Sequence, residues 1–150
     1  MSAEERDEMY MKMALDEARL AAEEGEVPVG AVVVIGNKVI ARSHNRTEAL
    51  HDVTAHAEML AITAASEYLN GKYLDKCTLY VTVEPCAMCA GALGWSQISE
   101  VVYGAPDQKR GFHSLYHTPQ GPLHPKTLVR SGVLEEECAD LMRSFFRSRR

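Results

Sequence analysis

The chain has 150 residues, of which 46% are hydrophobic and 25% are charged, and its formal net charge at pH 7 is −5. This balance is typical of one globular domain over residues 1–150, and it excludes disordered and fibrous chains. The apolar runs are too short to cross a bilayer and the acidic N-terminus does not resemble a secretory signal, so we expect a cytoplasmic protein without membrane contacts. The negative charge argues against broad, nonspecific nucleic-acid binding.

The first third of the chain predicts a helix followed by a hairpin. Apolar residues recur at helical spacing over residues 3–24, which indicates an amphipathic helix. Segments rich in β-branched residues at 29–35 and 38–42 predict two strands. Gly36-Asn37 lies between these strands and suits the short turn of an antiparallel hairpin.

A second helix is predicted at residues 54–68, and it carries two candidate functional residues. Asp52 or Thr54 would be its N-cap, which places His56 and Glu58 in its first turn. Backbone N–H groups and the positive end of the helix dipole would then face the same site.

A third strand, residues 78–83, runs directly into Pro85-Cys86 and a third helix at 86–95. If Pro85 opens that helix, Cys86 and Cys89 lie on one face of its first turn, where the dipole favours thiolates. Strand-to-helix junctions are also where α/β proteins commonly place their chemistry.

The rest of the chain predicts a strand at 100–103, a loop rich in Pro and Gly at 104–126, a strand at 127–130 and a helix at 135–147. Helices separated by single strands after an initial hairpin indicate an α/β fold. We therefore predict a mixed five-stranded sheet flanked by helices in three α/β/α layers, with a metal bound at the N-termini of two helices.

The spacing of His56, Glu58, Cys86 and Cys89 predicts a catalytic zinc site. Structural zinc usually has four protein ligands, whereas catalytic zinc has three and keeps one position for water. Here one histidine and two cysteines supply the three ligands. Zinc would lower the pKa of that water, and the Glu58 carboxylate could move protons without binding the metal.

Two alternatives use the same motif without catalysis. A closed structural zinc site would need a fourth ligand, and the candidates are Cys77, Cys138, His44, His51 and His113. None stands in recognisable ligand spacing, and we expect both of these cysteines in the core. A zinc-stabilised binding module is the other alternative, but it would have no use for the Glu58 carboxylate.

The C-terminal segment combines arginines with aromatic residues, and two interpretations of it stay open. Its members are Arg143, Phe145, Phe146, Arg147, Arg149 and Arg150. They could hold a phosphate backbone. Equally, the arginines could complement a helix dipole at a solvated end while the phenylalanines enter the core.

The H-x-E and P-C-x-x-C motifs are the signature of zinc-dependent nucleobase deaminases. With residues 26–32, 79–84 and 101–105, they make this chain resemble the cytidine deaminase-like superfamily, and within it the bacterial tRNA-specific adenosine deaminases. The resemblance implies one Zn²⁺ per subunit, held by His56, Cys86 and Cys89. Hydroxide would attack C6 of the wobble adenosine in an arginine tRNA anticodon stem-loop, with Glu58 as proton shuttle and inosine as product.

The resemblance also implies a substrate pocket formed by Asn45, the Ala57 backbone, Val29 and Asp107. Asn45 would hydrogen-bond the purine and Asp107 would lie near a neighbouring nucleotide. Considered without the family, Asn45 in His44-Asn45-Arg46 can equally be a turn residue that bonds its own backbone.

RNA binding and a homodimer are further implications of the resemblance. The RNA-contact candidates are Lys109, Arg110, Phe145, Arg147, Arg149 and Arg150. The loop at 47–50 is less basic than in the family and Val53 replaces a common Pro, which weakens one expected RNA surface. The alternative is a free-base or nucleoside deaminase acting on guanine, cytosine or cytidine, whose relatives can carry a Trp at the position of Trp95. For Trp95 itself we expect a core-capping role.

Overall fold

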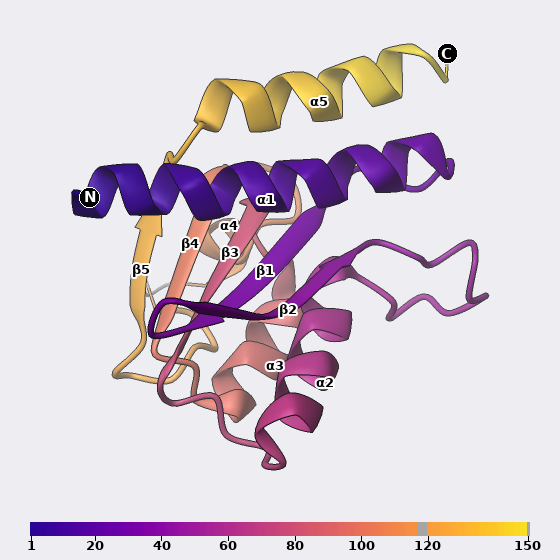
Figure 1. Cartoon of the computed structure of the whole chain (residues 1–150). Coiled ribbons are helices and arrows are strands. Elements are labelled where there is room, and N and C mark those ends of the chain that lie inside the picture. The colour runs from indigo at the N-terminus through magenta and orange to yellow at the C-terminus, as the bar shows by residue number, and fades with distance from the viewer. Residues whose placement is uncertain (117–119, 150) are drawn as a thin grey trace.

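The computed structural model describes residues 1–116 and 120–149, and its elements form a mixed sheet between helices (Figure 1). The strands are β1 (Gly30–Ile35), β2 (Lys38–His44), β3 (Cys77–Val83), β4 (Glu100–Ala105) and β5 (Leu128–Ser131). The helices are α1 (Ala3–Glu23), α2 (Ala57–Leu69), α3 (Ala87–Ser96), α4 (Phe112–Leu115) and α5 (Glu135–Arg147).

The five strands are ordered β2-β1-β3-β4-β5. The hairpin partner β2 and the central strand β3 both run antiparallel to β1, whereas β3, β4 and β5 are parallel to one another. The predicted mixed five-stranded sheet is therefore confirmed. Because the parallel strands end at the same edge of the sheet, the segments that follow β3 and β4 meet there.

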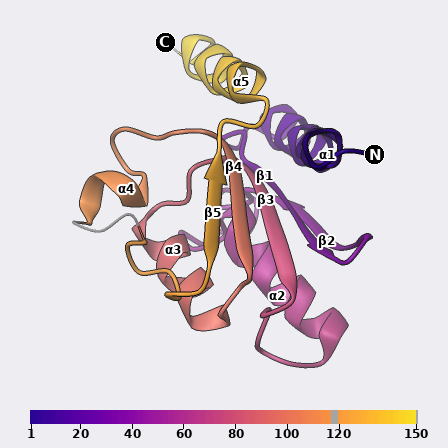
Figure 2. The same cartoon turned by 90° about the vertical axis from the view of Figure 1, so that its left-hand side faces the viewer.

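Two helical layers cover the sheet. Helices α1 and α5 lie on one face, and α2 and α3 lie on the other (Figure 2). Successive side chains of a strand point to opposite faces of the sheet, so each strand packs against both helical layers. Val32 and Val102 pack with α1, whereas Val33 and Val101 belong to the larger core on the α2 side. A Cβ at Gly30 would lie 1.9 Å from a backbone oxygen of α1, so this helix can approach β1 only over a glycine.

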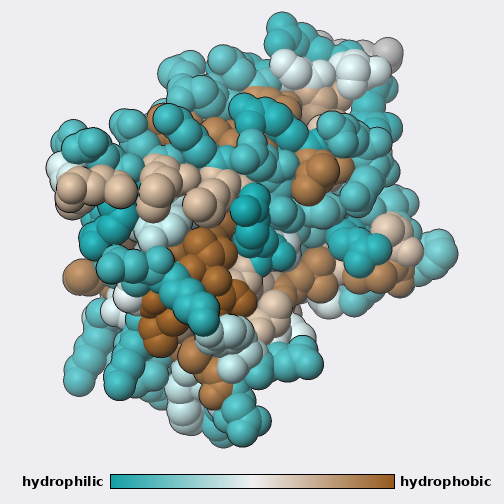
Figure 3. Space-filling model, in the orientation of Figure 1, coloured by the Kyte–Doolittle hydropathy of each residue, from teal (hydrophilic) through white to brown (hydrophobic). Residues whose placement is uncertain are grey.

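The outer surface agrees with this layering. The exposed sides of α1 and α5 are mainly hydrophilic, and hydrophobic side chains show over the strands below α1 (Figure 3). None of the described helices is long and apolar enough to cross a membrane.

Both helices that carry the candidate ligands begin directly after a ligand. His56 is the N-cap of α2 and Cys86 is the N-cap of α3, so the prediction that His56 lies in the first helical turn is wrong. The predicted cap is also wrong, because Asp52 instead accepts hydrogen bonds from the backbone N–H (2.8 Å) and hydroxyl (2.7 Å) of Thr54. An aspartate that closes such a local turn satisfies the backbone before the helix begins.

The segment predicted as a loop at 104–126 contains two regular pieces. β4 extends to Ala105, and α4 is a short helix whose Phe112 is fully buried. Phe112 N donates to Pro85 O at 3.0 Å, which ties α4 to the junction before α3. Helical periodicity cannot reveal a helix of one turn, because it needs several turns to show.

Candidate active site

The β3–α3 junction and the start of α2 bring the predicted ligands together. His56 Nδ1 lies 3.7 Å from Cys86 Sγ and 3.5 Å from Cys89 Sγ, and the three ligand atoms all lie within 4.8 Å of one another. Tetrahedral zinc with ordinary Zn–S and Zn–N bond lengths would separate nitrogen and sulfur ligands by about 3.6 Å. The donor set and its spacing therefore fit zinc.

The structure supports three protein ligands rather than four. Within residues 1–116 and 120–149, no further histidine, cysteine or carboxylate joins this cluster. Cys77 and Cys138, two of the alternative ligands, are buried in the hydrophobic cores as expected. Burial raises the pKa of the Cys138 thiol to about 12, which describes an inert core thiol. A three-ligand site leaves a position for water, as catalytic zinc requires.

Charge at the cluster is set by hydrogen bonding and burial. Hydrogen bonds from Cys89 and His56 lower the pKa of the Cys86 thiol to about 4, so its sulfur is a thiolate at neutral pH. Glu58 is only 3% exposed, and this burial raises the pKa of its carboxyl group to about 7. A carboxyl group that can both take up and release a proton near neutral pH thus lies beside the metal-ligand cluster.

The cluster opens into a pocket of about 770 Å³. We call His56, Glu58, Cys86 and Cys89 the pocket floor, because they are buried or half-buried and all but Cys89 line the pocket. Among the exposed residues that line it, we call Lys109, Arg110, Arg143 and Phe146 the pocket rim. Val29, Asn45 and Asp107, three of the substrate-binding candidates, also line it.

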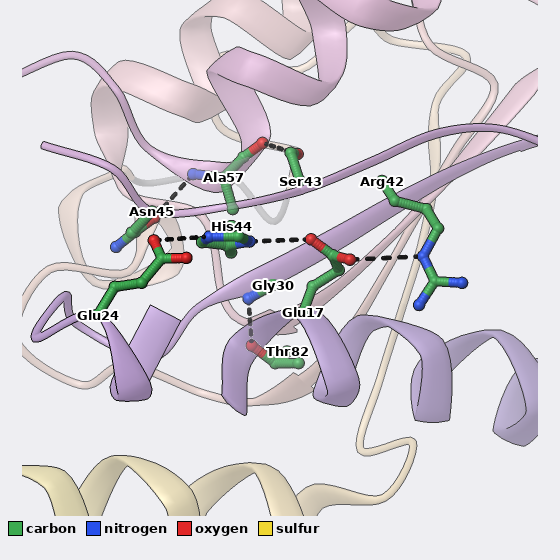
Figure 4. Close-up of polar contacts among 9 residues, drawn as sticks. All are labelled: Glu17, Glu24, Gly30, Arg42, Ser43, His44, Asn45, Ala57 and Thr82. Atoms are coloured by element: carbon green, nitrogen blue, oxygen red, sulfur yellow. Dashed lines mark hydrogen bonds and ion pairs between the residues drawn. The ribbon is translucent and has the colours of Figure 1, made fainter. Parts of the chain in front are cut away.

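Asn45 connects one wall of the pocket to the start of α2. Its side-chain oxygen accepts a hydrogen bond from Ala57 N at 2.7 Å, and Ala57 O accepts one from the Ser43 hydroxyl at 2.7 Å (Figure 4). Ala57 is fully buried and supports the pocket through Asn45 instead of lining it. The alternative in which Asn45 only bonds its own turn is wrong, because its partner is twelve residues away.

The neighbouring His44 fastens this wall to α1. Its ring nitrogens lie 2.9 Å from Glu17 Oε1 and 3.1 Å from Glu24 Oε1, and Arg42 reaches the other oxygen of Glu17 (Figure 4). Partial burial opposes charging of His44, but the hydrogen bonds to the two glutamates outweigh it and raise its pKa. His44 is therefore a structural residue and not a fourth metal ligand.

The opposite wall is the turn that follows β4. Asp107 Oδ1 accepts hydrogen bonds from the backbone N–H groups of Lys109 and Arg110, both at 3.0 Å. Asp107 thus closes the turn that carries the two cations to the rim. Sequence reasoning selected these three residues, but it missed Glu84, whose buried carboxylate accepts from Asp107 N at 3.0 Å.

Helix α5 brings part of the basic and aromatic C-terminal segment to the rim. Phe145 is buried, and Arg149 stacks over its ring at 4.3 Å from the centroid. Arg147 bonds Ser144 on its own helix, so neither arginine lines the pocket. Arg150 lies outside the described residues. Instead, Phe146 and Arg143 line the mouth, one turn apart on the same helix face.

Trp95 does not cap the core, and that expectation is wrong. Its side chain is 86% exposed at the end of α3, where it lines a hollow of about 510 Å³ together with Ile62, Lys72 and Tyr73. The core side of α3 is filled instead by Ala90 and Leu93, which lie on the other side of the helix from Trp95. A single large aromatic cannot be assigned to a helix face when the whole helix is apolar.

A mixed α/β sheet that presents one histidine, two cysteines and a buried glutamate at two helix N-termini defines the class of zinc-dependent nucleobase deaminases. The chain belongs to this family: the cytidine and deoxycytidylate deaminase zinc-binding region matches residues 4–105. It is a zinc-dependent hydrolytic deaminase.

Among similar proteins, the chain is 47% identical to the tRNA-specific adenosine deaminase of Bacillus subtilis, over 97% of this chain and 91% of that protein. It is 44% identical to the chloroplastic tRNA(adenine(34)) deaminase of Arabidopsis thaliana over 95% of its own length, but spans only 12% of that longer protein. A structure solved in a study of A-to-I editing by tRNA:A34 deaminases at the wobble position of transfer RNA matches with a TM-score of 0.81 and 45% identity, covering 89% of this chain and 98% of that one. The predicted family, its fold and its zinc requirement are confirmed.

Proposed function

We propose that this enzyme converts adenosine to inosine at the wobble position of a tRNA anticodon stem-loop. The observation that carries the proposal is the pocket itself: a three-ligand zinc cluster with Glu58 beside it, below a rim of three cations and one exposed phenylalanine. Cations at the mouth suit the phosphates that flank a base in a polymer, whereas a free base brings none. The relatives named above act on tRNA, and they cover almost the whole of this chain.

The chemistry needs a base that has left its stack and entered the pocket. Zinc, when held by His56, Cys86 and Cys89, supplies a water molecule activated for attack at neutral pH. Glu58 takes one proton from the attacking water and delivers it to adenine N1, then takes the second proton from the hydroxyl formed at C6 and delivers it to the departing amino group. Ammonia leaves, the C6 oxygen remains, and the product base is hypoxanthine in inosine.

Asn45 and Val29 orient the base in this proposal. Because the Asn45 side-chain oxygen accepts from Ala57 N, its NH₂ group is the part that can donate to an acceptor nitrogen of the purine. Val29 supplies an apolar wall beside it. Asp107 carries the turn that faces the neighbouring nucleotide, with Lys109 and Arg110 towards the phosphates.

We further propose a cytoplasmic homodimer. Trp95, Tyr73 and Met88 are exposed, and Trp95 and Tyr73 line one hollow beside α2 and α3. Large exposed aromatics of this kind mark protein interfaces more often than free surface. Sedimentation should give the mass of two chains for the wild type and of one chain for Trp95→Glu. A monomeric wild type would contradict the dimer.

The proposed reaction is tested by incubating the zinc-loaded enzyme with an anticodon stem-loop that carries adenosine at the wobble position. Inosine should form there, while guanine, cytosine, cytidine and free adenosine, assayed in parallel, should release little ammonia. A stem-loop with the adenosine moved one position along the loop is the matched control. Ammonia from a free base combined with an unchanged stem-loop would overturn the substrate assignment and leave the zinc chemistry intact.

A further inference from the structure

Glu84 is a buried carboxylate that the reaction does not use. It lies between the end of β3 and Pro85-Cys86, and its side chain is 3% exposed. Burying an ionised carboxylate is costly unless donors surround it. Three donors do: Asp107 N at 3.0 Å on Oε1, and both His113 N (2.9 Å) and His113 Nδ1 (3.0 Å) on Oε2.

These contacts span one continuous segment, residues 107–113. Its two ends are bound by the two oxygens of the same carboxylate. Between them, Gly111 pairs with Cys86 through an isolated β-bridge. A Cβ on Gly111 would lie 2.3 Å from the Glu84 carboxyl carbon, so the segment packs directly on the carboxylate. The segment is therefore shaped around Glu84.

The His113 ring also contacts two aromatic side chains. It stacks on the buried Phe112 ring with centroids 4.5 Å apart, and the Tyr103 hydroxyl lies 3.1 Å from its Nδ1. Tyr103 belongs to β4, so the ring joins the segment to the sheet as well as to Glu84. A loop with these fixed ends has little freedom to rearrange when a ligand arrives.

The middle of the segment carries Lys109 and Arg110, whose side chains are exposed at the rim. Within the part of the chain that the structure describes, the backbone N–H groups of both residues bond only to Asp107. Asp107 in turn is held by Glu84 through its own N–H. The placement of the two cations thus depends on a chain of contacts that begins at Glu84.

From this geometry we propose that Glu84 is a positioning residue for the polynucleotide substrate: by holding residues 107–113, it fixes Lys109 and Arg110 where they meet the phosphates beside the reacting base. This inference rests on the proposed RNA substrate. It assigns Glu84 no contact with the base and no part in proton transfer. Loss of the Glu84 carboxylate should therefore lower the affinity for the substrate. It should leave the rate of the chemical step at the pocket floor nearly unchanged once the base is bound.

The test is Glu84→Gln in the zinc-loaded enzyme. The amide keeps the shape of the side chain but turns an NH₂ group towards a backbone N–H that needs an acceptor. Kd and KM for the wobble-adenosine stem-loop should rise about tenfold, the equivalent of one charge-assisted hydrogen bond, with kcat within about twofold of wild type. Zinc content should stay at one per chain.

Salt dependence separates positioning from simple loss of structure. Each phosphate contact on a single strand contributes about 0.7 to the slope of log K against log salt, so losing the contacts of Lys109 and Arg110 should lower the slope by about 1.4. Glu100→Gln is the matched control, because it also removes one negative charge but lies at the far end of β4, paired with Arg130 at 3.1 Å. It should leave the slope unchanged.

A double-mutant cycle completes the test. In a Lys109→Ala/Arg110→Ala background, Glu84→Gln should weaken RNA binding little further, because the cations that it positions are gone. Equal weakening in both backgrounds, or an unchanged Kd and slope in Glu84→Gln while the wild type still makes inosine, would overturn the positioning role and leave the proposed function standing. If the wild type makes no inosine, the proposed function fails and this inference fails with it.

Gly111→Ala provides a second variant if Glu84→Gln does not fold. Its backbone φ is −64°, which any residue adopts, but the added Cβ would lie 2.3 Å from the Glu84 carboxyl carbon and 2.4 Å from the Asp107 backbone oxygen, so it separates the segment from the carboxylate. A folded, zinc-containing Gly111→Ala should show the same rise in Kd and the same lower slope. Wild-type values for both would overturn the proposal.

Discussion

The pocket floor consists of residues held at two helix N-termini by short sequence motifs, whereas the pocket rim consists of exposed side chains from a turn after β4 and from α5. The floor is buried or half-buried, and its three ligand atoms have spacings that a metal ion requires. The rim is charged and its side chains are exposed, although Arg143 also pairs with Asp140 and Glu136 on its own helix. This difference implies that chemistry and substrate choice can be changed separately.

The largest effect is expected at the floor. Cys86→Ala removes one of three ligands, so the enzyme should lose its zinc and all measurable turnover. Metal analysis and an inosine assay on the same sample check this. Cys77→Ala is the control, because it removes a buried thiol outside the cluster and should keep one zinc per chain. A fully active, zinc-containing Cys86→Ala would refute the ligand assignment.

Glu58→Gln should separate metal binding from proton transfer. The variant keeps the ligand cluster but loses the proton carrier, so kcat should fall by about 10² to 10⁴-fold while zinc stays bound. Stem-loop affinity should remain close to that of the wild type. Near-normal kcat in this variant would mean that another group moves the proton.

Phe145 and Phe146 are adjacent, but one belongs to the core and the other to the rim, so their substitutions should affect different properties. Phe146 is 48% exposed at the pocket mouth, and loss of stacking in Phe146→Ala should weaken RNA binding by about 1–3 kcal/mol with little change in stability. Phe145 is buried, so Phe145→Ala should instead lower the free energy of unfolding by about 3–5 kcal/mol. Reversed results from RNA titration and urea unfolding would exchange the two assignments.

The smallest effect is expected at His44, which joins the pocket wall at Asn45 to Glu17 and Glu24. Because the folded-state pKa of His44 is raised, its charged form adds stability that is complete below its unfolded pKa and is lost as pH rises through the folded pKa. The stability of the wild type relative to His44→Gln should therefore decrease from acidic towards alkaline pH, as measured by urea unfolding. A difference that is constant with pH would remove His44 from the titrating groups.

The floor could be predicted from the sequence because its ligands sit in short motifs. His56, Glu58, Cys86 and Cys89 are separated by fixed intervals next to predicted strand and helix boundaries, and the zinc chemistry limits what such a set can do. The mixed sheet followed from the alternation of helices and strands. The exact helix starts did not, because local turns such as that of Asp52 compete with helix caps.

The rim and its supports could not be predicted in the same way. Phe145 and Phe146 are adjacent and chemically identical, and only the docking of α5 decides which is buried. Glu26 and Glu84 look like solvated charges in the sequence, yet both are buried and accept backbone N–H bonds from loops at the pocket. Tertiary contacts of this kind join residues 22 to 29 positions apart, beyond the reach of local patterns.

The separation of floor from rim is tested most directly by the steady-state kinetics of Lys109→Ala/Arg110→Ala on the wobble-adenosine stem-loop. Loss of two phosphate contacts should raise KM by about tenfold or more at physiological salt and leave kcat close to the wild-type value. A reduced kcat with an unchanged KM would contradict this account, because it would place these two cations in the chemical step and not in substrate binding.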